Sequence, residues 1–136
     1  MPVGGHLKPD PYYRAAGALE IYGREAAEEV ASFEARQVKE IKDLVEKNNI
    51  DCDFVVTRAT DVCLYDEANR DLKKGLDKLT KAGVSTADGV FYSDGRTAEG
   101  VSMSQCVRYW YADDFQASGI KGAKGCFTYT AGHIWP

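Results

Sequence analysis

The sequence lacks the long apolar run that a transmembrane helix requires, because none of its hydrophobic stretches approaches roughly 18 residues. It also lacks an excess of positive charge: 17 lysines and arginines stand against 21 aspartates and glutamates, and the net charge is -4. An acidic balance excludes the electrostatic footprint of a nucleic-acid-binding domain. The first residues lack the basic start and apolar centre of a secretory signal peptide. We therefore expect a cytoplasmic protein that binds neither nucleic acid nor membrane.

Histidines and cysteines at the spacing of a zinc site are absent from the sequence. None of the four cysteines forms a C-x-x-C pair, and the two histidines lie at opposite ends of the chain, so we expect no metal. Isolated cysteines of this kind are typical of free, buried thiols in a reducing compartment. A disulfide between neighbouring strands, joining Cys52 to Cys63, is the alternative. The cysteines are Cys52, Cys63, Cys106 and Cys126, and the histidines are His6 and His133.

The first third of the sequence predicts two consecutive helices. Asp10 can cap the first helix with Pro11 at its first position, and Gly23 marks its end. A longer helix covers residues 24–47 and ends at an asparagine pair, because asparagine tolerates the left-handed cap conformation. Its apolar residues recur at helical spacing, and we expect them to face a core. They are Ala27, Val30, Phe33, Val38, Ile41, Leu44 and Val45.

The second half of the sequence predicts short strands around one more helix. Residues 54–57 and 62–65 are rich in β-branched and aromatic side chains, and the four residues between them predict a hairpin. A helix then runs from a cap at Asp66 to a stop at Gly83. Its apolar stripe consists of Ala68, Leu72, Leu76 and Leu79, and later strands are predicted at residues 90–92 and 125–130. These elements predict an α+β fold.

Residues 102–117 differ in composition from the rest and predict an insertion. Tyr109-Trp110-Tyr111 concentrates three large aromatics, and the segment shows no helical stripe and little alternation. Joining the residues on either side restores a helix–strand connection of ordinary length. Three interpretations stay open for this segment: an inserted surface loop or extra strand, translated intron sequence, and an aromatic binding platform.

The opening Gly4-Gly5-His6 has the clearest chemical use in the sequence. Paired glycines let backbone N–H groups approach a ligand closely, and a neighbouring histidine can donate a hydrogen bond or move a proton near neutral pH. A flexible N-terminal tail is the alternative interpretation. Arg58, in the predicted hairpin turn, can clamp a substrate carboxylate, although a solvated arginine is the more usual occupant of such a turn.

The string from Gly4 to Tyr13, GGHLKPDPYY, resembles a loop of FAD-dependent oxidoreductases of the D-amino-acid oxidase superfamily, fungal type. Residues 50–58 and 121–136 are similar to the same family, in the same order. The resemblance implies FAD as cofactor and hydride transfer from an amine or amino-acid carbon to the flavin. It also implies that Gly4, Gly5 and His6 lie near the flavin. His133 would belong to a strand-to-helix connection and have a structural role.

The resemblance also implies a division of the chain into two parts. Residues 1–49 would be a helical remnant of the FAD-binding domain, and residues 50–136 a partial substrate-binding domain with a small antiparallel sheet. The Gly-rich strand–turn–helix unit that binds pyrophosphate in that family is missing from the sequence. We therefore expect a truncated internal segment that binds FAD poorly and is inactive alone. A non-catalytic truncated product or an orphan interaction domain is the alternative, and no residue is identified as catalytic.

Overall fold

A computed structural model describes residues 5–94 and 122–134 of the chain, and the predicted insertion at 102–117 lies outside these ranges. The described elements are strand β1 (Gly5–Leu7), helices α1 (Tyr13–Tyr22) and α2 (Arg24–Asn48), strand β2 (Val55–Cys63), helix α3 (Asp66–Ala82), the 3-10 helix η1 (Ser85–Gly89), and strands β3 (Phe91–Asp94) and β4 (Gly125–Ile134). The helices and the antiparallel sheet confirm the predicted α+β fold class.

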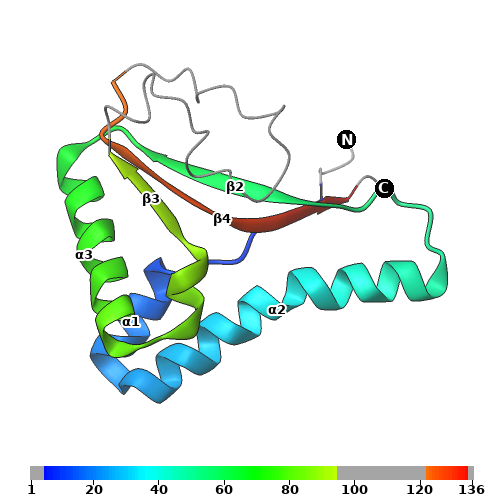
Figure 1. Cartoon of the computed structure of the whole chain (residues 1–136), viewed down its shortest axis with the longest axis horizontal. Helices are drawn as coiled ribbons and strands as arrows, with labels where there is room; N and C mark the ends of the chain where they lie inside the picture. Colours follow the sequence, from blue (N-terminus) through cyan, green and yellow to red (C-terminus); the bar gives the residue numbers. More distant parts are fainter. Residues whose placement is uncertain (1–4, 95–121, 135–136) are drawn as a thin grey trace.

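Strand β4 is the centre of the sheet and pairs antiparallel with each of the other described strands. Strand β2 runs along one side of β4, from Val55 opposite His133 to Cys63 opposite Gly125. Strands β1 and β3 share the other side, with β1 at the C-terminal end of β4 and β3 at its N-terminal end. The first and last described strands therefore lie side by side, although most of the chain separates them in sequence (Figure 1).

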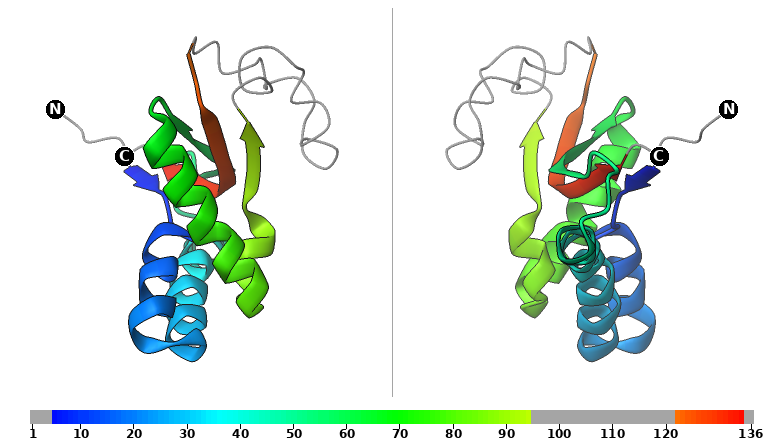
Figure 2. Two further views of the ribbon diagram at one scale, coloured as in Figure 1. Left: turned by 90° about the vertical axis from the view of Figure 1, so that its left-hand side faces the viewer. Right: turned by 90° about the vertical axis from the view of Figure 1, so that its right-hand side faces the viewer.

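The core lies between the helices and one face of the sheet. Figure 2 shows α1 and α2 below the strands and α3 alongside them. Phe127 of β4 is fully buried, and the ring of Tyr12, just before α1, stacks on it with 4.8 Å between ring centroids. Leu76 and Leu79 of α3 are buried in the same cluster, as the predicted stripe requires, whereas Ala68 is exposed. The core thus joins the loop before α1 to the C-terminal strand.

The ends of the helices follow the signals in the sequence. Gly23 separates α1 from α2 with a φ of 87°, and Gly83 ends α3 with a φ of 71°. Asn49 ends α2 in the left-handed conformation, with a φ of 48°. The starts of α1 and α3 differ from expectation. The first residue of α1 is Tyr13, and Pro11 lies in the bend before it. The predicted cap at Asp66 is wrong, because Asp66 is the first residue of α3, and Tyr65, at the N-cap position, makes no side-chain hydrogen bond to the helix.

The predicted apolar face of α2 is only partly buried. Ala27 and Val38 are buried, but Val30, Phe33 and Leu44 are 39%, 60% and 55% exposed. The expectation that Phe33 faces a core is therefore wrong in this chain. The physical reason is that α2 leaves the other helices after its first turns and extends past them as a long arm (Figure 1). Helical spacing identifies an apolar face but does not determine whether a partner covers it.

The predicted hairpin at residues 54–65 is wrong. Residues 55–63 form one continuous strand, in which each residue lies opposite a residue of β4. The four residues of the supposed turn, Arg58 to Asp61, include no glycine, proline or asparagine, which are residues that favour tight turns. Pairing with a strand near the other end of the chain satisfies the backbone groups that a local turn would have left to solvent.

The three described cysteines are free and buried, which confirms the predicted thiols at Cys52, Cys63 and Cys126. The alternative prediction of a Cys52–Cys63 disulfide is therefore wrong. Cys106 lies outside the described residues. Within residues 5–94 and 122–134, no three histidine, cysteine or acidic side chains come together as a metal site would require. Among the helices of the same ranges, none combines the length and apolar character needed to cross a membrane.

Candidate functional site

The two histidines of the sequence meet where β1 pairs with β4. His6 lies directly opposite His133, and Gly5 lies opposite Ile134. Because directly opposite residues of an antiparallel pair project to the same face, both imidazoles belong to one face of the sheet. His6 is exposed and His133 is half-buried. The expectation that His133 belongs to a strand-to-helix connection is therefore wrong, since this residue lies within β4.

Gly5 is required by packing between the strands. A Cβ atom at Gly5 would lie 2.4 Å from Cγ2 of Ile134 and 3.2 Å from the carbonyl oxygen of the same residue. The side chain of Ile134 thus fills the space that a ligand would need beside the Gly5 backbone. Gly4, the other glycine expected near a flavin, lies outside the described residues. The flavin contacts of Gly5 and His6 stay predictions.

The described residues do not form a cradle for a dinucleotide. Such a cradle consists of a strand, a Gly-rich turn and a helix N-terminus within a parallel β–α–β unit, whose N–H groups bind the pyrophosphate. All strand pairs within residues 5–94 and 122–134 are antiparallel. The described residues near His6 therefore lack the β–α–β unit that binds the pyrophosphate of FAD, and they do not fit the whole cofactor.

Arg58 lies in the middle of β2, and its predicted position in a solvated turn is wrong. Its Nη2 donates hydrogen bonds to the carbonyl oxygens of Thr128 at 3.0 Å and Gly89 at 3.4 Å. The guanidinium lies over the ring of Phe91, 4.7 Å from the centroid. These contacts join β2, β4, η1 and β3 on the second face of the sheet. The carboxylate clamp is not supported, because the donors of Nη2 point to backbone carbonyls.

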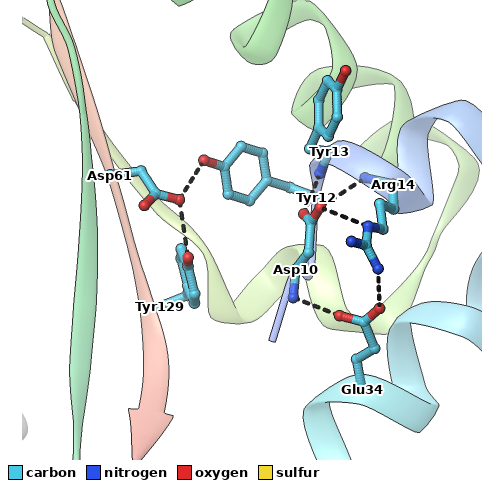
Figure 3. Close-up of polar contacts among 7 residues, drawn as sticks. All are labelled: Asp10, Tyr12, Tyr13, Arg14, Glu34, Asp61 and Tyr129. Carbon is cyan, nitrogen blue, oxygen red and sulfur yellow. Dashed lines mark hydrogen bonds and ion pairs between the residues drawn. The ribbon is translucent and has the colours of Figure 1, made fainter. Parts of the chain in front are cut away.

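Asp61, which was expected in the hairpin turn, is the centre of a polar cluster between the sheet and α1. Its Oδ2 accepts hydrogen bonds from the hydroxyls of Tyr12 and Tyr129, both at 2.9 Å (Figure 3). Its Oδ1 lies 2.5 Å from Nζ of Lys8. Asp61 projects to the helix side of the sheet because it lies opposite the buried Phe127. Three donors therefore hold one carboxylate.

The donors around Asp61 decide its charge. Burial alone raises the pKa of Asp61, but the hydrogen bonds from Lys8, Tyr12 and Tyr129 outweigh burial, so the pKa lies below its ordinary value. Burial and the adjacent carboxylate both raise the pKa of Tyr12 and that of Tyr129. Burial and the same charge also raise the pKa of the Cys63 thiol. At neutral pH the cluster therefore consists of an ionised carboxylate and two protonated phenols.

A second network fixes the loop that leads into α1. The carboxylate of Asp10 accepts hydrogen bonds from the backbone N–H groups of Tyr13 at 2.8 Å and Arg14 at 3.2 Å. Asp10 thus caps the first turn as predicted, but from two residues before the N-cap position, which is Tyr12. The N–H of Asp10 donates to Glu34 of α2 at 2.7 Å, and Arg14 lies 3.5 Å from the same carboxylate (Figure 3). The loop between β1 and α1 is thus anchored to both helices.

A cleft of about 550 Å³ opens beside the Asp61 cluster, within the range of small-molecule sites. Lys8, Asp10 and Asp61 provide its charged groups, so two acids and one base leave the lining with one net negative charge. Its rim is open, since Tyr13 and Tyr65 are 66% and 75% exposed. The other residues of the lining are Pro9, Tyr12, Val62, Cys63, Leu64, Ala68, Leu72 and Tyr129.

The sequence contained a signal for Asp61 that the hairpin interpretation hid. If residues 55–63 are taken as one strand, Asp61 falls on the same face as Ala59 and Cys63. An acid on a mostly apolar face indicates a buried charge that needs partners. Its partners Tyr12 and Tyr129 come from distant parts of the chain, and no local pattern identifies them.

Comparisons with protein-family models, with curated proteins and with solved structures found no match to this chain. The resemblance to flavin-dependent oxidoreductases therefore rests on the residues themselves. Its consequences for function enter below as a proposal.

Proposed function

We propose that the chain is a segment of a FAD-dependent oxidoreductase acting on amines or amino acids. The pairing of β1 with β4 supports this proposal. The string around His6 and the string around His133 resemble the same enzymes from opposite ends of the sequence, and they lie side by side in one sheet. Strings that serve one site are expected to meet in space, although nearly the whole chain lies between them.

In such an enzyme the flavin accepts the hydride, and the protein supplies binding and orientation. We infer that His6 would contact the polar edge of the ring system, and its exposed position at the end of the sheet supports this role. Gly5 keeps β1 in close contact with β4 and thereby holds His6 in register. Residues 5–94 and 122–134 contain no parallel β–α–β unit for the pyrophosphate, so we expect the isolated segment to be inactive.

A flavin titration of the full chain tests this proposal. We expect FAD, FMN and riboflavin to bind with similar dissociation constants, no tighter than high micromolar, because only the ring system has a contact. His6→Ala removes about one hydrogen bond, on the order of 1 kcal/mol, and should weaken binding roughly fivefold. Lys39→Met, on the exposed part of α2, is the control and should leave binding unchanged. Quenching of flavin fluorescence measures the dissociation constant of each flavin for the unsubstituted chain and for both variants.

Two results would count against this proposal. A submicromolar dissociation constant for FAD requires about 8 kcal/mol or more, which a single strand end does not supply, and would show that the chain does hold the dinucleotide. Equal affinity of His6→Ala and the unsubstituted chain, or no binding of any flavin at millimolar concentration, would reject the role of His6.

A non-catalytic interaction domain is the second candidate function, and the exposed apolar side chains favour it. Tyr22, Phe33 and Tyr65 are 74%, 60% and 75% exposed, and Ile21 is 71% exposed. Large apolar groups that gather into one patch at the surface are typical of contact sites for other proteins, and Ile21 and Tyr22 are neighbours at the end of α1. Failure of the flavin titration together with peptide binding at the cleft, described next, would favour this candidate.

A further inference from the structure

We propose that the cleft beside Asp61 binds a lysine side chain presented by another polypeptide, with Asp61 as its counter-ion. This inference does not rest on the flavin proposal, because the cleft contains neither His6 nor His133. It goes beyond that proposal in assigning a different ligand to a different part of the chain.

The chain's own Lys8 shows which chemistry the site accepts. Its Nζ lies 2.5 Å from Oδ1 of Asp61, so a primary ammonium on an aliphatic stem already occupies the carboxylate. The side chain of Lys8 is 49% exposed, and exposed ion pairs of this kind are weak. Tyr12 and Tyr129, by contrast, are 4% and 3% exposed and belong to the core. An incoming ammonium can therefore replace Lys8 while the tyrosines keep Asp61 in place.

The two oxygens of Asp61 differ, and the difference favours lysine over arginine. Oδ2 accepts two hydrogen bonds, from Tyr12 and Tyr129, whereas the ammonium contacts Oδ1. A guanidinium binds a carboxylate most strongly through both oxygens at once, in a planar fork. With Oδ2 already bound on two sides, that fork cannot form, and a point charge such as an ammonium suits the single remaining oxygen.

The walls of the cleft fit a side chain that arrives from a polypeptide. Cys63, Ala68 and Leu72 line it, and apolar walls suit the four-carbon stem of lysine, which packs along apolar surface while its charged end is bound. The rim carries Tyr13 and Tyr65, both largely exposed, which offer contacts to residues on either side of the lysine. A free small molecule would need a site that encloses most of its surface, and this cleft is open.

The charges around the cleft also select a basic partner. Asp10 is the second acid of the lining and lies 3.9 Å from Nε of Arg14, so once Lys8 is displaced Asp61 is the lining carboxylate that needs a new cation. The whole chain has a net charge of -4, so long-range attraction acts in the same direction. The partner we infer is therefore a lysine-containing segment with apolar residues beside the lysine.

A titration with a blocked pentapeptide, in which leucines flank a central lysine, tests the proposal by calorimetry on the full chain. We expect Lys8→Met to bind this peptide roughly two- to fivefold more tightly than the unsubstituted chain, because no internal ammonium competes. Asp61→Asn should bind at least about tenfold more weakly, since the charge-assisted contact is lost. Lys39→Met, which removes a lysine far from the cleft, should bind like the unsubstituted chain.

Three further ligands test whether the cleft requires an ammonium group and whether that group must belong to a peptide. The same peptide with norleucine or arginine in place of lysine should bind at least several times more weakly, and so should n-butylamine. If the norleucine peptide binds as tightly as the lysine peptide, or if Lys8→Met does not raise the affinity for the lysine peptide, the proposed site is wrong. Butylamine as tight as the peptide would overturn the polypeptide partner. If Asp61→Asn fails to fold, as circular dichroism would show, the Lys8→Met result alone decides.

Discussion

Replacement of Asp61 by asparagine measures how much the cluster in Figure 3 stabilises the fold. The asparagine side chain would keep the shape of the aspartate and remove its charge, so the hydroxyls of Tyr12 and Tyr129 would donate to a neutral oxygen. A hydrogen bond to a charged group contributes about 1.5–3 kcal/mol and a neutral one about 0.5–1.5 kcal/mol, so each tyrosine loses roughly 1–1.5 kcal/mol. Loss of the exposed pair with Lys8 adds at most about 1 kcal/mol. The expected cost of Asp61→Asn is about 2–4 kcal/mol.

Urea unfolding followed by far-ultraviolet circular dichroism measures this cost. With a slope of about 1–3 kcal/mol per molar urea, the midpoint of Asp61→Asn should fall by roughly 1–2 M. The matched control is Asp43→Asn, whose carboxylate is exposed and pairs with Lys39 one turn away in α2. Its midpoint should stay close to that of the unsubstituted chain. Equal midpoints for the two variants would refute the reasoning, because the buried carboxylate would then contribute no more than an exposed one.

The pH dependence of the same variant has a definite sign. The pKa of Asp61 is lower in the folded chain than its ordinary value of 3.8, so the ionised carboxylate stabilises the fold above that value. This contribution is lost as the pH falls through the folded pKa. The difference in free energy of unfolding between the unsubstituted chain and Asp61→Asn should be full at neutral pH and should shrink below pH 3.8. A constant difference down to strongly acidic pH would show that Asp61 is not ionised in the folded chain.

Two further pairs of variants test the packing. Gly125→Ala should destabilise by about 1–3 kcal/mol, because its Cβ would lie 2.3 Å from Oδ1 of the buried Asn69. A Cβ atom at Gly17 in α1 would have no neighbouring atom within 4 Å, so Gly17→Ala should stabilise the fold by about 0.5–1 kcal/mol. Thermal midpoints of the two glycine variants that move in the same direction would contradict this contrast. Phe127→Ala removes a fully buried ring and should cost about 3–5 kcal/mol, whereas Phe33→Ala, 60% exposed, should cost on the order of 0.5 kcal/mol. Similar urea midpoints for the two phenylalanine variants would show that α2 is covered in solution.

Local signals in the sequence were enough for the helices and the fold class. Gly23, Asn49 and Gly83 end helices because these residue types tolerate the left-handed backbone, and this preference acts within one turn. The cap at Asp10 is equally local, since the N–H groups that donate to it lie within four residues. These features need no knowledge of the rest of the molecule, because the atoms that decide them are neighbours along the chain.

The tertiary structure alone decided the pairing of the strands and the place of Asp61. The β-branched residues of 55–63 fit a strand, but only the presence of β4 as a partner makes this stretch one strand instead of a hairpin. Likewise, the spacing on α2 predicted an apolar face, and the path of the helix left Phe33 exposed. The physical reason is the same for the pairing of β2 and for the exposure of Phe33: sheet pairing and burial depend on which distant segments come together. The partners of Asp61, from Lys8 to Tyr129, likewise span almost the whole sequence.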